Sequence, residues 1–261
     1  GEQSNTFEEN TNLTSLVEKI FDFNYSTNYI YDKDNRLKNI DYFRIHGNNI
    51  TFNYDGLGRL DNKLISTGNT FYKTEYKYKP GTTAGLTTNK IEEIINNGLS
   101  TKYTYDANGN IETITDANGL ITKYIYNDLN ELLRVDDQIN NKTTTLQYDI
   151  GGNILNKKEY TPCKLGIDDL STLTPSKSNS YEHNDANWKD KLTAVNGVAV
   201  THDAIGNLLT DDKGNSYTWE WGRQLAGISG NGNNISYKYD DSGIRTEKTV
   251  NGVTTKYRVV G

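Results

Sequence analysis

Three histidines and one cysteine are the residues of this chain best suited to acid–base, nucleophilic or metal chemistry. None of His46, His183 and His202 stands at zinc-ligand spacing from another His or from Cys163. A nucleophilic Cys needs a His base, and His183 is the one candidate that could approach Cys163 in space. A bystander thiol and a packing role for His202 are favoured. We therefore expect no enzyme activity, no metal site and no cofactor.

Paired carboxylates are the second chemical candidate. Acidic doublets at 136–137, 168–169 and 211–212 could serve glycoside hydrolysis, but doublets in turns are usually solvated. The run from Asp106 to Asn110 resembles a calcium loop, yet its Gly is fourth and position twelve is Ala117, whereas an EF-hand needs Gly at six and Glu at twelve. A weak calcium site built from turn carbonyls is left open.

Composition indicates an ordered β protein. The 261 residues carry 34% hydrophobic side chains and a net charge of −6, with 19 Tyr to supply buried area. Lys and Arg are scattered among acidic residues, which argues against nucleic acid as a partner. No 18-residue apolar run predicts a membrane span, and residues 1–4 do not resemble a signal peptide.

A short motif recurs along the chain, in which an aromatic residue and Asp are followed by Gly and then by an aliphatic residue. Its copies lie mostly 21–24 residues apart, and Phe7-Glu8 begins a degenerate first copy. Asp in such a turn accepts backbone N–H groups, Gly supplies the left-handed position, and Tyr is expected to stack on Tyr of the next repeat. The motif residues, all expected to be structural, are Tyr31, Asp32, Tyr54, Asp55, Gly58, Tyr105, Asp106, Gly109, Tyr126, Tyr148, Asp149, Gly152, His202, Asp203, Gly206, Tyr239, Asp240 and Gly243.

Each repeat is predicted to form a β-hairpin, with a second turn at pairs such as Asn97-Gly98 and Asn196-Gly197. We expect one β domain over residues 1–261, with a loop insertion near 161–180 that holds Pro162 and Pro175. One local signal disagrees, because apolar residues from Leu13 to Phe21 stand at helical spacing. The repeat frame favours a strand there.

This pattern resembles the YD-repeat, or RHS-repeat, family over nearly the whole chain. Segments 187–193, 217–226 and 237–245 resemble the C-terminal part of such proteins in Gram-positive bacteria. The resemblance implies an all-β fold, a twisted, spiralling antiparallel sheet of repeated hairpins that forms an open segment of a shell. It implies a secreted or surface-attached bacterial protein whose shell encloses a C-terminal toxin or effector. Partners would be the rest of the parent polypeptide and that effector, and open sheet edges would favour self-association.

Carbohydrate or cell-surface binding is the alternative function. Exposed indoles could stack on sugar rings, and Trp219 and Trp221 are expected to share one strand face by period-two alternation. A platform of this kind requires both indoles to be exposed and close together, whereas a core role, which is favoured, would bury them. The residues of this ligand platform would be Trp188, Trp219 and Trp221.

Overall fold

The computed structural model describes residues 2–20, 23–42 and 48–258, so His46 lies outside the described residues. Every regular element that it describes is a β-strand, which confirms the predicted all-β fold class. Among the described residues no helix is long and apolar enough to cross a membrane. By hydrogen bonding, β1–β17 belong to one antiparallel sheet and β18–β24 to a second.

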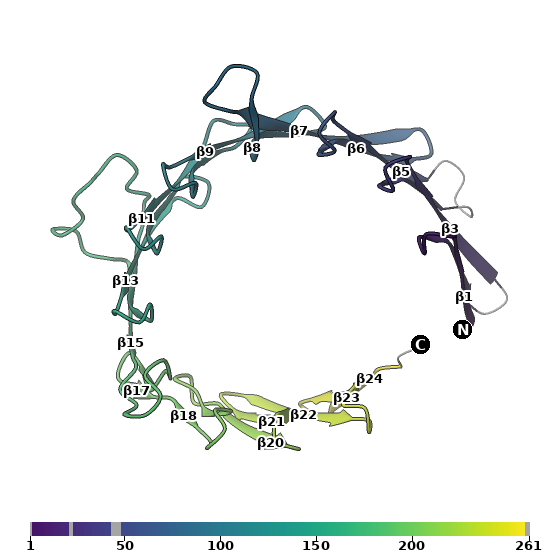
Figure 1. Cartoon of the computed structure of the whole chain (residues 1–261). Coiled ribbons are helices and arrows are strands. Elements are labelled where there is room, and N and C mark those ends of the chain that lie inside the picture. Colours follow the sequence, from purple (N-terminus) through teal and green to yellow (C-terminus); the bar gives the residue numbers. More distant parts are fainter. Residues whose placement is uncertain (1, 21–22, 43–47, 259–261) are drawn as a thin grey trace. The chain divides into compact units, whose positions relative to one another are not determined.

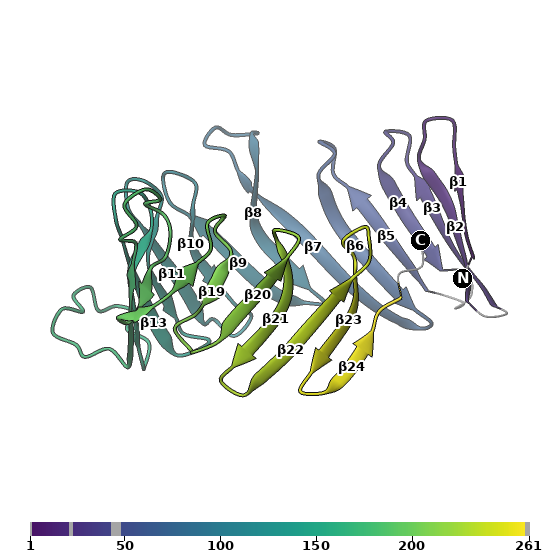
Figure 2. The same ribbon diagram turned by 90° about the horizontal axis from the view of Figure 1, so that it is seen from below.

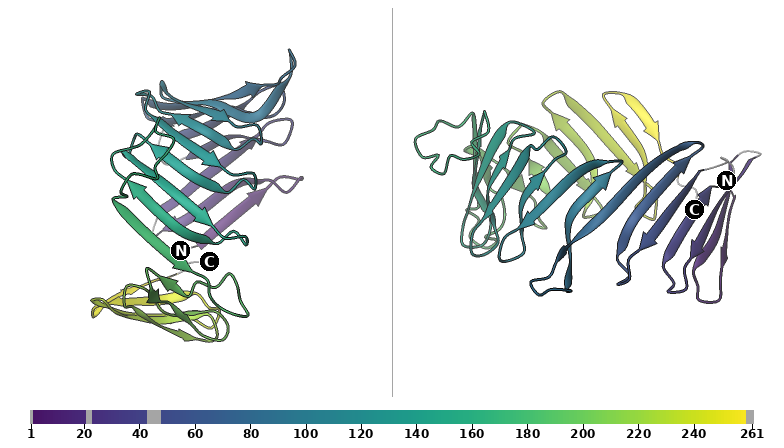
Figure 3. Two further views of the ribbon diagram at one scale, coloured as in Figure 1. Left: turned by 90° about the vertical axis from the view of Figure 1, so that its left-hand side faces the viewer. Right: turned by 90° about the horizontal axis from the view of Figure 1, so that it is seen from above.

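Two compact units divide the chain, residues 1–122 and 123–260. In the first unit each strand pairs antiparallel with the strand that follows it in sequence. Figures 1 and 3 show these purple-to-teal strands side by side in chain order. The strands are β1 (Glu2–Phe7), β2 (Leu13–Ile20), β3 (Phe23–Tyr31), β4 (Leu37–Tyr42), β5 (Asn49–Tyr54), β6 (Leu60–Thr67), β7 (Thr70–Pro80), β8 (Thr87–Asn96), β9 (Leu99–Tyr105) and β10 (Ile111–Thr115), and β11 (Ile121–Tyr126) contains the boundary.

In the second unit, too, successive strands are neighbours in a sheet. Val200 lies between β17, the last strand of the first sheet in sequence, and β18, the first strand of the second sheet. Figure 2 shows the green and yellow strands of the second sheet lying in sequence order. The strands are β12 (Leu132–Asp137), β13 (Lys142–Tyr148), β14 (Ile154–Tyr160), β15 (Lys177–Glu182), β16 (Ala194–Val195), β17 (Val198–Ala199), β18 (Thr201–His202), β19 (Leu208–Thr210), β20 (Ser216–Glu220), β21 (Gln224–Gly230), β22 (Asn233–Tyr239), β23 (Arg245–Val250) and β24 (Val253–Lys256).

Local sequence explains the hairpins. At one predicted turn Asn97 and Gly98 have φ angles of 50° and 87°, the left-handed pair that a tight hairpin needs. Leu13–Ile20 is strand β2, paired with β3, so the helical spacing of its apolar residues is overridden by the repeat. Residues 161–176, within the segment expected to be a loop insertion, contain no strand.

Little of the described chain is fully buried. The buried apolar side chains are Tyr160, Ala194, Val195 and Val200. Contacts between strands run chiefly between sequence neighbours, so among the residues that the structure describes no second layer covers the strands of either unit. Stability must therefore come largely from the hydrogen-bonded ladders and from the contacts that join one repeat to the next.

Candidate functional site: the seam between repeats

One turn geometry recurs at the motif. The backbone N–H of Asp55 donates to the carbonyl of Arg59, and the N–H of Gly58 donates back to the carbonyl of Asp55. The Asp55 Oδ1 atom accepts the N–H groups of Leu57 and Arg59, each at 2.9 Å. The same backbone closure is present in the turns that begin at Glu8, Asp32, Asp106, Asp116, Asn127, Asp149, Asp203, Asp211 and Asp240. We call this unit the Asp-turn.

The side chain four positions after the Asp usually completes the turn. Arg59 Nε donates to the second carboxylate oxygen of Asp55 at 2.7 Å, and Asn207 Nδ2 does the same for Asp203 at 2.7 Å. At Asn127 the roles are reversed, because its amide donates to the carboxylate of Glu131 at 2.6 Å. The carboxylate can therefore stand at the first position of the turn or four residues later, provided that a hydrogen-bond donor occupies the other position.

These hydrogen bonds favour the charged carboxylate. The side chain of Arg36 is the largest cause that lowers the pKa of Asp32, and Asn153 acts likewise on Asp149. The pKa of Asp211 falls to about 2, chiefly because the Asn215 side chain donates to it, with burial acting against this and the Asn215 N–H and the Tyr217 hydroxyl adding to it.

In several copies of the repeat, a tyrosine at the aromatic position is hydrogen-bonded to the preceding repeat. The Tyr54 hydroxyl donates to the carbonyl oxygen of Leu37 at 2.8 Å, and the Tyr78 hydroxyl donates to that of Leu60 at 2.8 Å. Leu37 and Leu60 each begin the strand that follows the previous Asp-turn. The other tyrosines that make this bond are Tyr31 to Leu13, Tyr105 to Ile91, Tyr148 to Leu132 and Tyr239 to Leu225.

Burial raises the pKa of Tyr78, Tyr105 and Tyr148, so these hydroxyls keep the proton that the bond requires. At His202 burial lowers the pKa, so a neutral imidazole fills the aromatic position there. Tyr126 ends β11 directly ahead of the Asn127 turn. The aromatic position thus supplies a hydrogen-bonded latch in most repeats and an aromatic filler at His202.

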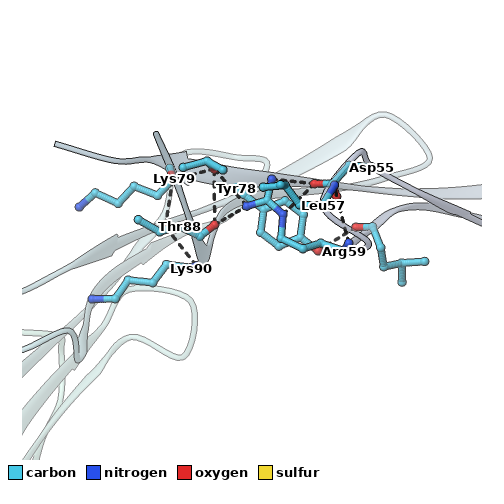
Figure 4. Close-up of polar contacts among 9 residues, drawn as sticks. Asp55, Leu57, Arg59, Tyr78, Lys79, Thr88 and Lys90 are labelled. Atoms are coloured by element: carbon cyan, nitrogen blue, oxygen red, sulfur yellow. Dashed lines mark hydrogen bonds and ion pairs between the residues drawn. The ribbon is translucent and has the colours of Figure 1, made fainter. Parts of the chain in front are cut away.

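A cation covers several of the latch rings. The guanidinium carbon of Arg59 lies 4.0 Å from the ring centroid of Tyr78, and that of Arg36 lies 4.6 Å from Tyr54. Figure 4 shows Arg59 between its Asp55 partner, the Tyr78 ring and the backbone of Thr88, to whose carbonyl its Nη1 donates. Stacking of Tyr on Tyr was expected, but at these two rings the neighbour is the Arg of the previous turn.

At some turns a side chain from an earlier part of the chain packs directly over the turn glycine. A Cβ atom on Gly206, whose φ is 88°, would lie 2.5 Å from the Trp188 ring. At Gly109 it would lie 2.5 Å from the Lys90 ammonium group. Gly206 is needed both for the backbone angle and for the Trp188 ring over it, whereas at Gly109 the flexible end of Lys90 can move and the backbone angle is the main requirement.

The predicted tryptophan platform does not form. Trp219 is half-buried in β20, and its Nε1 donates to the Leu208 carbonyl at 2.7 Å, where it takes the place of a latch tyrosine. Trp221 follows the end of β20 with a φ of 48° and is 89% exposed. The expectation that both share one strand face was wrong, because the strand ends between them. Trp188 lies over Gly206.

A buried polar network fastens the segment 161–176, and sequence reasoning missed it. Arg134 and Asp136 form an ion pair at 2.9 Å, and Arg134 Nη2 donates to the carbonyl of Lys164 at 2.9 Å. The Thr143 hydroxyl, which is fully buried, donates to Asp136 and accepts the N–H of Lys164 at 2.8 Å. Cys163 and His183 were considered as a nucleophile and its base. The backbone N–H of Cys163 donates to the side-chain oxygen of Asn141. A ring nitrogen of His183 lies 3.3 Å from the carbonyl oxygen of Ile154.

Residues 2–20, 23–42 and 48–258 contain no group of three or more His, Cys, Asp or Glu arranged to hold a metal ion. The recurring arrangement is structural. The Asp carboxylate holds the turn, the Tyr hydroxyl bonds to the backbone of the preceding repeat, and at some repeats a cation packs on the Tyr ring. Two Asp-turns were not recognised as copies of the motif. Asp211 follows Thr210 rather than Tyr, and Asp116, which follows Thr115, was expected only as the second turn of a hairpin. The Asp-x-x-Gly spacing is visible in both.

Comparison with known proteins identifies the repeat. Residues 91–123, which include the Asp106 and Asp116 turns, match the family model described as RHS Repeat. The chain is 28% identical over 210 residues to the tRNA nuclease WapA of Bacillus subtilis strain 168 and to the tRNA3(Ser)-specific nuclease WapA of Bacillus spizizenii. Each alignment covers 66% of this chain and 9% of the relative, so the chain spans a small part of those proteins.

Solved structures share the fold. The structure of TcdB2–TccC3 without its hypervariable C-terminal region matches 94% of this chain and 15% of that chain, with a TM-score of 0.54 and 16% identity. The Photorhabdus luminescens Tc holotoxin pore matches 86% of this chain and 13% of that chain, with a TM-score of 0.51 and 17% identity. The match at residues 91–123 shows an RHS repeat there, and the Asp-turns that recur along the described chain are further copies of the same structural unit.

Proposed function

We propose that this chain is a wall segment of a larger bacterial RHS-repeat protein and that the wall encloses a C-terminal effector of the same polypeptide. The observation that carries the proposal is the tyrosine latch, because the same hydroxyl-to-carbonyl bond joins six repeats to the one before. A wall built from repeats must allow further repeats to be added and must keep neighbouring repeats from separating. A hydrogen bond from a side chain to the backbone of the preceding repeat does both, because it can form again at each added repeat.

The relatives support an effector as the enclosed partner. WapA proteins are named as tRNA nucleases, and this chain covers 9% of them. We assign no catalysis to the present chain. Its contribution is to hold the rest of the parent polypeptide in place, in a protein that is secreted or attached to the bacterial surface.

Limited proteolysis of the full parent protein tests the wall. The C-terminal region is followed by mass, and the same region expressed alone is the control. The proposal predicts that the region survives until cuts accumulate in the repeats, whereas the isolated region is digested at once. Digestion of the C-terminal region at equal rates in both samples, with the repeats still intact, would overturn it.

A loosened wall sharpens the test. A parent variant with Tyr54→Ala and Asp55→Ala removes one latch and the carboxylate of its turn. We expect its C-terminal region to be cut earlier than in the wild type. A Lys33→Ala parent, altered at an exposed position of the Asp32 turn, should behave like the wild type.

A further inference from the structure

The second unit contains an open cleft of about 570 Å³ beside the turn that links β20 to β21. Its lining includes the aromatic residues Trp221, Tyr237 and Tyr239. The acidic residues Glu220, Asp240 and Asp241 also line it. The volume lies within the range of small-ligand sites. The cleft is separate from the latches, although Tyr239 contributes to both.

Trp221 lies in the turn between β20 and β21, where Trp221 and Gly222 have φ angles of 48° and 83°, close to those of Asn97 and Gly98. Asn adopts such an angle readily, whereas a large side chain adopts it at a cost, and the indole is 89% exposed. Trp219, two residues earlier, is half-buried and hydrogen-bonded. Other large apolar residues of the described chain are also exposed, such as Leu129 and Val253, so the exposure of Trp221 is informative only because Trp221 lines a cleft.

The charges of the cleft select the ligand. Asp240 begins an Asp-turn, but position four after it is Ile244, so no side chain of the described residues donates to its second carboxylate oxygen. Glu220 and Asp241 are exposed. The one lysine in the lining, Lys238, is paired with Glu247 outside the cleft at 2.8 Å. Arg245, which is not a lining residue, lies with its guanidinium carbon 5.5 Å from the ring centroid of Tyr237, so one aromatic residue of the cleft already faces a cation. The three acidic lining residues outnumber Lys238, and negative charge beside aromatic rings favours an organic cation.

We propose that this cleft binds the Lys or Arg side chain of a basic peptide segment. The cation lies over the Trp221 indole, and the carboxylates of Asp240 and Asp241 pair with it. A guanidinium group combines stacking with hydrogen bonding to carboxylates, so Arg is the better occupant. A neutral sugar could also stack on Trp221, but it would gain nothing from the net negative charge.

Calorimetric titration of the whole chain with an N-acetylated, C-amidated tri-arginine peptide tests the proposal. We expect saturable binding that weakens as salt rises, because exposed charges are screened. Trp221→Ala should weaken it about tenfold, and Asp241→Asn severalfold. Asp212→Asn, which removes a carboxylate outside the cleft lining, is the control and should bind like the wild type.

Three results would overturn the proposal. One is no heat of binding from a folded wild-type chain, as judged by circular dichroism. Another is tri-arginine binding that Trp221→Ala leaves unchanged. The third is equal or tighter binding of a neutral chitin trisaccharide without salt dependence, which would assign the cleft to a glycan. None of these results bears on the wall, since the latches do not depend on Trp221.

Discussion

The hydroxyl of Tyr54 donates a 2.8 Å hydrogen bond to the carbonyl oxygen of Leu37, which lies 17 residues earlier in the preceding repeat. The bond therefore crosses from one hairpin to the next and ties a side chain to backbone rather than to another side chain. The acceptor is present whatever residue occupies position 37. This explains how the repeats diverge in sequence while the join between them is kept.

Removing this latch should destabilise the chain. Tyr54→Phe deletes the hydroxyl and keeps the ring under Arg36, so we expect a loss of about 1 kcal/mol in the free energy of unfolding. Urea denaturation measures it. Tyr72→Phe is the control, because Tyr72 is exposed and its hydroxyl bonds to no residue that the structure describes. Equal losses in the two variants would contradict a latch.

Much of this arrangement follows from sequence. The repeat spacing predicted the all-β fold and placed Leu13–Ile20 in a strand against its own helical pattern. The Asn-Gly pairs predicted hairpin turns because few residues accept two positive φ angles. The hydrogen-bond partner of the tyrosine hydroxyl could not be predicted from sequence, because the acceptor is a backbone carbonyl and every residue has one.

Other features depend on contacts that no local pattern records. Arg134 reaches the carbonyls of Lys164 and Asp168, 30 or more positions away, so its role depends on how the segment 161–176 folds back. Trp221 leaves the strand face because β20 ends at Glu220, and alternation in sequence does not show where a strand ends.

The Asp-turns should make stability depend on acid. The folded pKa of Asp211 is about 2, below the value near 3.9 of an unfolded Asp, so its contribution is present above about pH 4 and is lost as pH falls through about 2. Asp211→Asn sets an amide against the donors of Asn215 and Tyr217 and should be less stable than wild type at pH 7.

The difference between wild type and Asp211→Asn should shrink as pH falls from 4 toward 2. Urea unfolding at several pH values measures it. A difference that stays constant over this range would show that the carboxylate charge is not what the turn uses.

The close approach at Gly206 gives a matched comparison. Gly206→Ala must place a Cβ against the Trp188 ring, whereas Gly214→Ala, at a φ of 80°, meets no atom within 4 Å. We expect Gly214→Ala to cost about 1 kcal/mol for the left-handed backbone and Gly206→Ala about 1–3 kcal/mol more. Thermal denaturation compares them, and equal costs would mean that Trp188 moves aside freely.

The buried pair should hold the segment 161–176. Asp136→Ala leaves Arg134 buried without its partner and should cost about 3–5 kcal/mol, with earlier proteolytic cutting between residues 161 and 176. Asp168→Ala keeps the carbonyl that Arg134 uses and should change neither quantity by much. If the segment is cut in Asp136→Ala at the wild-type rate, the buried network does not hold the segment in place.

Native-state hydrogen exchange of Tyr54→Phe tests most directly whether neighbouring repeats are joined through the latch. The join predicts faster exchange in β4 and β5, the strands that carry Leu37 and Tyr54, and little change in β12–β14. Faster exchange confined to the few amides beside residue 54, with β4 as protected as in the wild type, would contradict it.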